Sequence, residues 1–129
     1  MDGVALALPA LLRAEKLQKR AARQGFDWTD LDGPMDKLRE EMDELAAAET
    51  EQDRIEEAGD LLFAAVNVAR AYGVAPEDAL RAANSKFERR YRGMEELAQQ
   101  RGLDFATLTI DQQEAMWRDV KASEAHKAT

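Results

Sequence analysis

Two pairs of acidic residues near the middle of the chain have a spacing that suits metal binding. Glu41 and Glu44 lie three residues apart in EEMDE, and Glu57 and Asp60 lie three apart in EEAGDLLF. Residues three apart on a helix share a face, with Cβ atoms about 5–6 Å apart. If the two helices pack antiparallel, four carboxylates converge and repel one another unless a cation neutralises them. Mg²⁺ prefers oxygen ligands, so the pattern favours a magnesium site.

A solvated acidic surface is the alternative, because 34% of the residues are charged and such pairs are common on exposed helices. Two features of the second pair argue for a site. It adjoins LLFAAV at 61–66, which is apolar nearly all round. Gly59 lies inside it, where helix propensity disfavours glycine by about 1 kcal/mol. The glycine indicates the close approach of another backbone or of a ligand.

The elements that would position these residues are helical, because apolar residues recur at three- and four-residue steps and no stretch alternates like a strand. We expect an all-α fold, a helical bundle of about five helices, with the helix at 52–72 the most buried. Breaking and capping residues mark the segments: 9–23, a second from 32, 52–72, 76–102 and a last one capped by Thr109, with Gln112 at the spacing of a capping box.

Length and composition limit what the chain can be. With 129 residues and 45% hydrophobic content, residues 1–129 are expected to form a single domain, with a linker-like start at 1–9 and a tail at 125–129. There is no cysteine and no apolar run long enough for a membrane span, so we expect a soluble cytoplasmic protein that does not bind membranes. A formal net charge of −8 argues against binding to a nucleic-acid backbone.

Four segments occur in an order that resembles the MazG family. They are EEMDE, EEAGDLLFAAVNVAR, ANSKFERRYR and MWRDVK, and the resemblance spans roughly residues 10 to 124. It is strongest to the C-terminal catalytic domain of bacterial MazG proteins. The resemblance implies an all-α nucleoside triphosphate pyrophosphohydrolase that cleaves (d)NTPs between the α- and β-phosphates, giving a monophosphate and pyrophosphate. It also implies a homodimer or a dimer of dimers.

The resemblance implies that the two acidic pairs hold metal, in agreement with the spacing. Glu41, Glu44, Glu57 and Asp60 would then bind Mg²⁺, with Mn²⁺ able to substitute. Glu56 is the nearest spare carboxylate and could orient, or accept a proton from, the attacking water. The alternative for Glu56 is a solvated helix residue.

A basic segment at 86–92, KFERRYR, supplies candidate phosphate-binding residues. Lys86 and Arg90 lie four apart and share a helix face, which suits contact with phosphate oxygens and with charge that develops during phosphoryl transfer. The alternative is a pair of exposed basic residues that form salt bridges with Glu88 and Glu95. Asn84 is a further candidate for binding the phosphate or orienting a ligand carboxylate.

Three residues are candidates for binding the nucleoside. Trp117 and Lys121 lie four apart in the segment that resembles the family, where an aromatic face could stack on a base and a lysine could reach a phosphate or a base edge. The alternative for Trp117 is core packing. Trp28, in GFDW, lies in a predicted loop that could close over the base or pack between subunits.

Several alternatives remain open at the level of sequence. The fold would also suit a pyrophosphatase with a narrower substrate, such as dUTP, dCTP or phosphoribosyl-ATP. It would equally suit a non-catalytic helical module that only oligomerises, with the acidic pairs as plain surface. The residues do not specify base or sugar preference, or whether the chain is a free-standing protein or one domain of a larger one.

Overall fold

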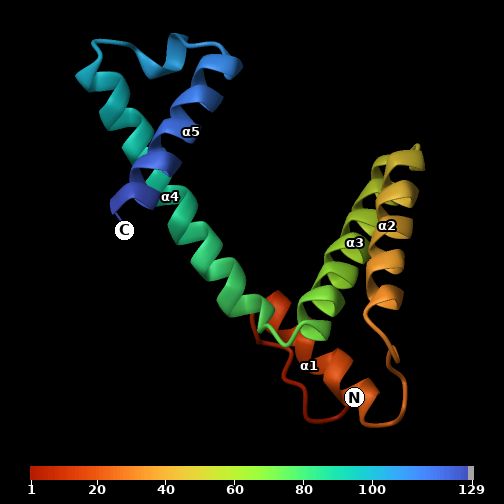
Figure 1. Cartoon of the computed structure of the whole chain (residues 1–129). Helices are drawn as coiled ribbons and strands as arrows, with labels where there is room; N and C mark the ends of the chain where they lie inside the picture. The colour runs from red at the N-terminus through yellow and green to blue at the C-terminus, as the bar shows by residue number, and fades with distance from the viewer. Residues whose placement is uncertain (128–129) are drawn as a thin grey trace. The chain divides into compact units, whose positions relative to one another are not determined.

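The structure, a computed structural model, describes residues 1–127 and is built from helices (Figure 1). Among those residues there is no strand, which confirms the all-α prediction, and each helix begins within one residue of its predicted start. None of these helices has the length and apolar character needed to cross a membrane. The helices are α1 (Ala10–Ala22), α2 (Asp32–Ala47), α3 (Glu51–Ala71), α4 (Pro76–Gln100) and α5 (Ile110–Lys127), with a short 3-10 helix at Phe105–Thr107.

The chain divides into two compact units, one of residues 1–80 and one from residue 81 onward. The first holds α1, α2, α3 and the start of α4; the second holds the rest of α4 and α5. That the whole chain forms one domain stays a prediction. The segment predicted as a tail is helical as far as Lys127, and residues 128 and 129 lie outside the described part.

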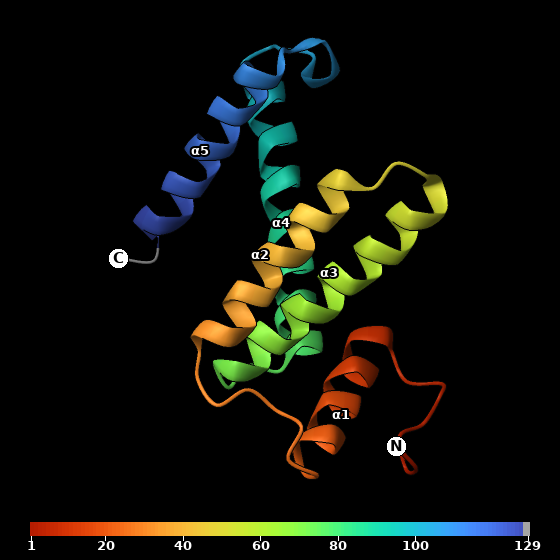
Figure 2. The ribbon, with the colours of Figure 1, turned by 90° about the vertical axis from the view of Figure 1, so that its right-hand side faces the viewer.

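In the first unit α2 and α3 form an antiparallel pair, and α1 contacts α3 (Figure 2). The connection between α2 and α3 is only three residues long, which forces the two helices to run back along each other. Thr50 ends this connection and caps α3, since its Oγ1 accepts a hydrogen bond from the backbone N of Asp53 at 3.1 Å. The buried residues Ala64 and Val66 of α3 and Pro34 of α2 are small, which allows close helix packing.

The prediction that the helix at 52–72 is the most buried is wrong for the single chain. Ile55 is 61% exposed, Leu62 60% and Phe63 44%. The physical reason is that α3 packs mainly against α2 and α1 in this unit, and two helices cannot cover a segment, 61–66, that is apolar nearly all round. Part of its apolar surface is therefore left open within the first unit.

In the second unit α4 and α5 pack through a small apolar core. Met94 and Ala98 of α4 and Met116 of α5 are buried, and Trp117 and Val120 pack against them. Gly93 allows this approach, because a Cβ atom there would lie 3.1 Å from Cγ1 of Val120. The unit is a helical hairpin whose two arms meet through side chains.

The predicted capping box at the start of α5 is confirmed. Oγ1 of Thr109 accepts a hydrogen bond from the backbone N of Gln112 at 3.2 Å, and Oε1 of Gln112 accepts one from the backbone N of Thr109 at 2.8 Å. We expect Thr109→Ala to lower the free energy of unfolding by about 1 kcal/mol, because one helix-end N–H loses its partner. Thr109→Ser keeps the acceptor and should match the wild type in urea denaturation. Equal losses in both variants would contradict this role.

Candidate active site

The structure brings three of the predicted metal ligands together. Glu41 and Glu44 project from α2 and Glu57 from α3, and one carboxylate oxygen from each lies within 4.8 Å of the others. The antiparallel packing of α2 and α3 produces this convergence. Asp60 lies one turn further along α3, is exposed, and is not part of this group of three. Its predicted role as a ligand stays a prediction.

Two oxygens of this cluster are buried without a hydrogen-bond partner. Glu41 is only 4% exposed, and its Oε1 lies 3.0 Å from Nζ of Lys37. Its Oε2 and the Oε2 of Glu57 are both buried and unpaired in the structure. A buried carboxylate oxygen without a partner is costly, so these two atoms fit a site for a hard cation.

The electrostatics of the cluster also fit a cation site. Repulsion from the Glu41 carboxylate, then partial desolvation, then contact with Glu57 raise the pKa of Glu44 above its ordinary value. The hydrogen bond to Glu41 raises the pKa of Lys37, so this ammonium stays charged beside the cluster. One lysine does not balance three carboxylates, and the cluster retains an excess of negative charge.

Glu56, the candidate to orient water, lies next to Glu57 on α3 and is exposed. Exposure leaves its carboxylate accessible to water. The structure is therefore compatible with either role considered for it, and its part in proton transfer stays a prediction.

The candidate phosphate-binding residues all lie on α4, in the second unit. Asn84 and Lys86 are exposed, whereas the Arg90 side chain is only 15% exposed. Nε of Arg90 donates a hydrogen bond to Oε2 of Glu124 on α5 at 2.9 Å. The alternative pairing of Lys86 and Arg90 with Glu88 and Glu95 is not found among the described residues: Arg90 pairs with Glu124, and Glu88 pairs with Arg92 at 2.6 Å.

Trp117 lies beside Arg90 in this unit. The guanidinium carbon of Arg90 is 5.4 Å from the centroid of the indole ring. The centroids of the Phe87 and Trp117 rings are 5.8 Å apart. Trp117 is half-buried and packs against the apolar core, so it contributes to packing as well as to a cation–π contact. Lys121, one turn along α5, is exposed. Nucleoside binding by Trp117 and Lys121 stays a prediction.

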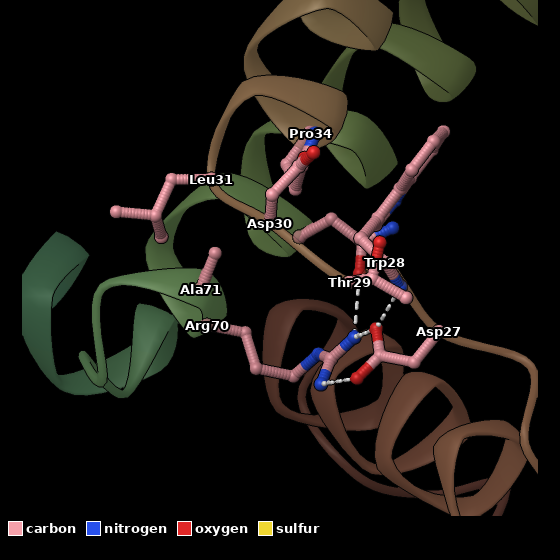
Figure 3. Close-up of a pocket in the computed structure, with 9 residues that line it drawn as sticks. Asp27, Trp28, Thr29, Asp30, Leu31, Pro34, Arg70 and Ala71 are labelled. Carbon is pink, nitrogen blue, oxygen red and sulfur yellow. Dashed lines mark hydrogen bonds and ion pairs between the residues drawn. The ribbon is translucent and has the colours of Figure 1, made fainter.

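Trp28 borders a cavity of about 380 Å³ in the first unit (Figure 3). The cavity lies between the α1–α2 loop and the end of α3, and Trp28 is 46% exposed there. Arg70 reaches from α3 to Asp27, and the two side chains form an ion pair at 2.6 Å. The loop that carries Trp28 is thus attached to α3.

Comparison with known proteins assigns the part of the chain that carries these residues to a family. Residues 32–94 match the profile of the MazG nucleotide pyrophosphohydrolase domain, and this range contains both acidic pairs as well as Asn84, Lys86 and Arg90. Residues 32–94 belong to the MazG family. The match thus covers α2, α3 and most of α4, which carry the cluster and the candidate phosphate-binding residues.

Relatives extend this match over almost the whole chain. The chain is 46% identical over 129 aligned residues, 96% of its length, to the nucleoside triphosphate pyrophosphohydrolase of Escherichia coli, and covers 49% of that protein. It is 41% identical over 91% of its length to the nucleoside triphosphate pyrophosphohydrolase/pyrophosphatase MazG of Thermotoga maritima, and covers 46% of it. It is 42% identical to the uncharacterized protein YabN of Bacillus subtilis, of which it covers 26%. The chain spans about half the length of the first two.

Sequence reasoning missed several residues around the candidate site of this chain. Asp27 and Arg70 are 43 residues apart, and no helical spacing connects them. Glu124, the partner of Arg90, is 34 residues away from it. The sequence signal for the first pair is the opposite charge of the Asp in GFDW and the Arg in NVAR. In a chain with this many charged residues, many other pairs have opposite charges as well.

Proposed function

We propose that this chain hydrolyses nucleoside triphosphates between the α- and β-phosphates and releases a nucleoside monophosphate and pyrophosphate. One observation carries the proposal: three carboxylates converge from two antiparallel helices, and two of their oxygens are buried without a partner. The MazG match and the names of the two nucleoside triphosphate pyrophosphohydrolases support the substrate class.

Glu41, Glu44 and Glu57, together with Asp60, would hold Mg²⁺, and Mn²⁺ could substitute, because oxygen-only ligand sets suit both ions. When bound, the ion supplies Lewis-acid polarisation of a phosphate oxygen and lowers the pKa of a bound water. Lys37 stays paired with Glu41 and so limits the negative charge of the cage. The protein's own contribution is to hold the ligand oxygens in place before substrate arrives.

In the proposed reaction a water oxygen bonds to the α-phosphorus, and the bond from that phosphorus to the bridging oxygen breaks. Glu56 accepts the proton of the water or orients it. Lys86 and Arg90 neutralise charge that develops on the departing pyrophosphate, and Asn84 donates a hydrogen bond to a phosphate oxygen. Arg90 would exchange its partner Glu124 for the phosphate, since both are anionic acceptors. Trp28, Trp117 and Lys121 contact the nucleoside.

The product analysis tests this proposal. Incubation with a panel of NTPs and dNTPs and Mg²⁺ should yield monophosphate and pyrophosphate in equal amounts, and EDTA should stop the reaction. A diphosphate and orthophosphate as products would refute cleavage between the α- and β-phosphates. Turnover of only one substrate in the panel would replace the broad assignment with a narrow one.

Metal binding has its own test, which does not depend on turnover. Mg²⁺ should raise the melting temperature, because a ligand that binds only the folded state stabilises it by about 2.7 kcal/mol at a hundred times its Kd. Ca²⁺ serves as a comparison cation, and Na⁺ at matched ionic strength controls for screening. Identical melting curves in Mg²⁺ and Na⁺ would favour a plain acidic surface on a non-catalytic module.

A further inference from the structure

The loop that carries Trp28 is held by its own side chains. Oδ1 of Asp27 accepts a hydrogen bond from the backbone N of Trp28 at 2.9 Å. Three residues later, Oδ1 of Asp30 accepts one from the backbone N of Gly33 at 2.8 Å, in the first turn of α2. Both contacts fix backbone close to Trp28, so the loop enters α2 in a defined conformation.

A two-pronged ion pair ties the same loop to α3 (Figure 3). Nη2 of Arg70 donates to Oδ1 of Asp27 at 2.6 Å, and Nη1 donates to Oδ2 at 3.2 Å. Nη2 also donates to Oδ1 of Asn67 at 3.1 Å, one turn earlier on α3. The Arg70 side chain is 16% exposed and that of Asp27 35%. A bidentate, partly buried pair fixes geometry far better than an exposed single contact does.

Gly33 provides the space for the indole ring. A Cβ atom at Gly33 would lie 2.4 Å from Cε3 of Trp28, closer than any real contact of a Cβ atom. Gly33 lies inside α2 and its φ is not positive, so space rather than backbone conformation accounts for glycine here. The ring therefore lies directly on the backbone at the start of α2.

These contacts constrain the backbone on both sides of a large aromatic side chain that is half-exposed at a cavity. Trp28 borders a space of about 380 Å³, which it shares with Asp27, Asn67 and Arg70. The more an aromatic ring is restricted before binding, the less conformational entropy it loses when another ring stacks on it.

We propose that Asp27, Arg70 and Gly33 are positioning residues that hold Trp28 in the orientation that contacts the nucleoside of the substrate. The inference rests on the proposed function, in which Trp28 touches the nucleotide. Asp27 and Arg70 act through the loop, and Gly33 acts by leaving room for the ring. None of the three needs to contact the substrate itself.

Kinetics provide the first test. In Asp27→Asn and in Gly33→Ala, we expect KM for a nucleoside triphosphate to rise about tenfold with kcat within about twofold, because Trp28 contacts the substrate equally in ground and transition states. Gly33→Ala also favours the helix intrinsically, so it displaces the ring without weakening α2. Arg70→Lys keeps the charge but loses the two-pronged geometry, and should raise KM less than Arg70→Ala does.

Fluorine NMR provides a readout that does not depend on turnover. The chain has two tryptophans, so protein labelled with 5-fluorotryptophan should give two resonances, and Trp28→Phe identifies one of them. We expect Asp27→Asn and Gly33→Ala to shift or broaden the Trp28 resonance and to leave that of Trp117 in place as an internal reference. An α,β-methylene nucleotide with Mg²⁺ should move the Trp28 resonance of the wild type, at concentrations about tenfold lower than in the variants.

The matched control is Asp36→Asn, which removes an exposed ion pair with Arg39 at 3.0 Å on α2. It should change neither KM nor the Trp28 resonance. The inference is overturned if Asp27→Asn and Gly33→Ala keep the KM of the wild type, whether or not the resonance moves, or if they lower kcat alone. If the wild type releases no pyrophosphate, the proposed function is refuted, and the titration with the α,β-methylene nucleotide then tests the inference alone. Equal affinity of wild type and variants for this nucleotide overturns the inference.

Discussion

Glu41→Gln, Glu44→Gln and Glu57→Gln should each lose kcat by roughly 100-fold or more, since even the residues behind metal ligands typically contribute 10–100-fold. The three carboxylates supply oxygens that lie within 4.8 Å of one another, and glutamine removes one negative charge while it keeps the size of the side chain. Mg²⁺ should also lose its stabilising effect in these variants. Initial-rate assays and melting curves with and without Mg²⁺ measure the two effects.

The metal-free fold should survive these changes. The raised pKa of Glu44 means that the folded state disfavours its ionised form. Below the ordinary carboxyl pKa, ionisation of Glu44 therefore has no effect on the free energy of unfolding. As the pH rises through the raised pKa, its ionisation lowers that free energy and destabilises the protein. In EDTA, Glu44→Gln should thus be at least as stable as the wild type at pH 7.5, and any gain should vanish near pH 4. Melting curves at the two pH values check the sign.

Two further variants complete this experiment. Asp43→Asn, exposed on α2 between two cluster residues, should keep both activity and stabilisation by Mg²⁺. Asp60→Asn decides whether the fourth acidic residue belongs to the site, because the structure leaves it outside the group of three. Near-normal activity in all three cluster variants would end the metal-site proposal.

The spacing of residues in the sequence was sufficient to predict those features of this protein that depend on a single helix. The three-residue spacing of the acidic pairs predicted that their carboxylates would converge if the two helices packed antiparallel, and Glu41, Glu44 and Glu57 do converge. Spacing along one helix does not specify where each carboxylate points, and Asp60 shows this, since it shares a face with Glu57 and yet lies outside the cluster.

Contacts between distant segments could not be predicted from the sequence. Arg70 could pair with many acidic residues, and only the fold brings Asp27 to it. Arg90 is similar, because its partner Glu124 comes from the other arm of the α4–α5 hairpin. Burial of α3 was overestimated for a related reason: hydrophobicity shows that a surface needs cover, but not whether that cover comes from the same chain.

The uncovered surface of α3 is the basis for the prediction of a homo-oligomer. Ile55, Gly59 and Leu62 recur at steps of four and three residues and so share one face of α3. Ile55 is 61% and Leu62 60% exposed, and a Cβ atom at Gly59 would meet no atom within 4 Å. The close approach that a helical glycine indicates is therefore not made within the first unit, residues 1–80. We propose that a second copy makes it, in a homodimer or a dimer of dimers, as two-fold symmetry permits.

Leu62→Asp should then convert the assembly to monomers. Burial of one leucine is worth about 1.5–3 kcal/mol, and a two-fold interface contains it twice, so the dissociation constant should rise by at least roughly 100-fold. Leu6→Asp, at a leucine that is 85% exposed near the start of the chain, is the matched control and should leave the assembly intact. Light scattering over a concentration series measures the mass of both variants. A wild type that stays monomeric at every concentration, yet hydrolyses nucleotides, would show that the open face of α3 needs no second subunit.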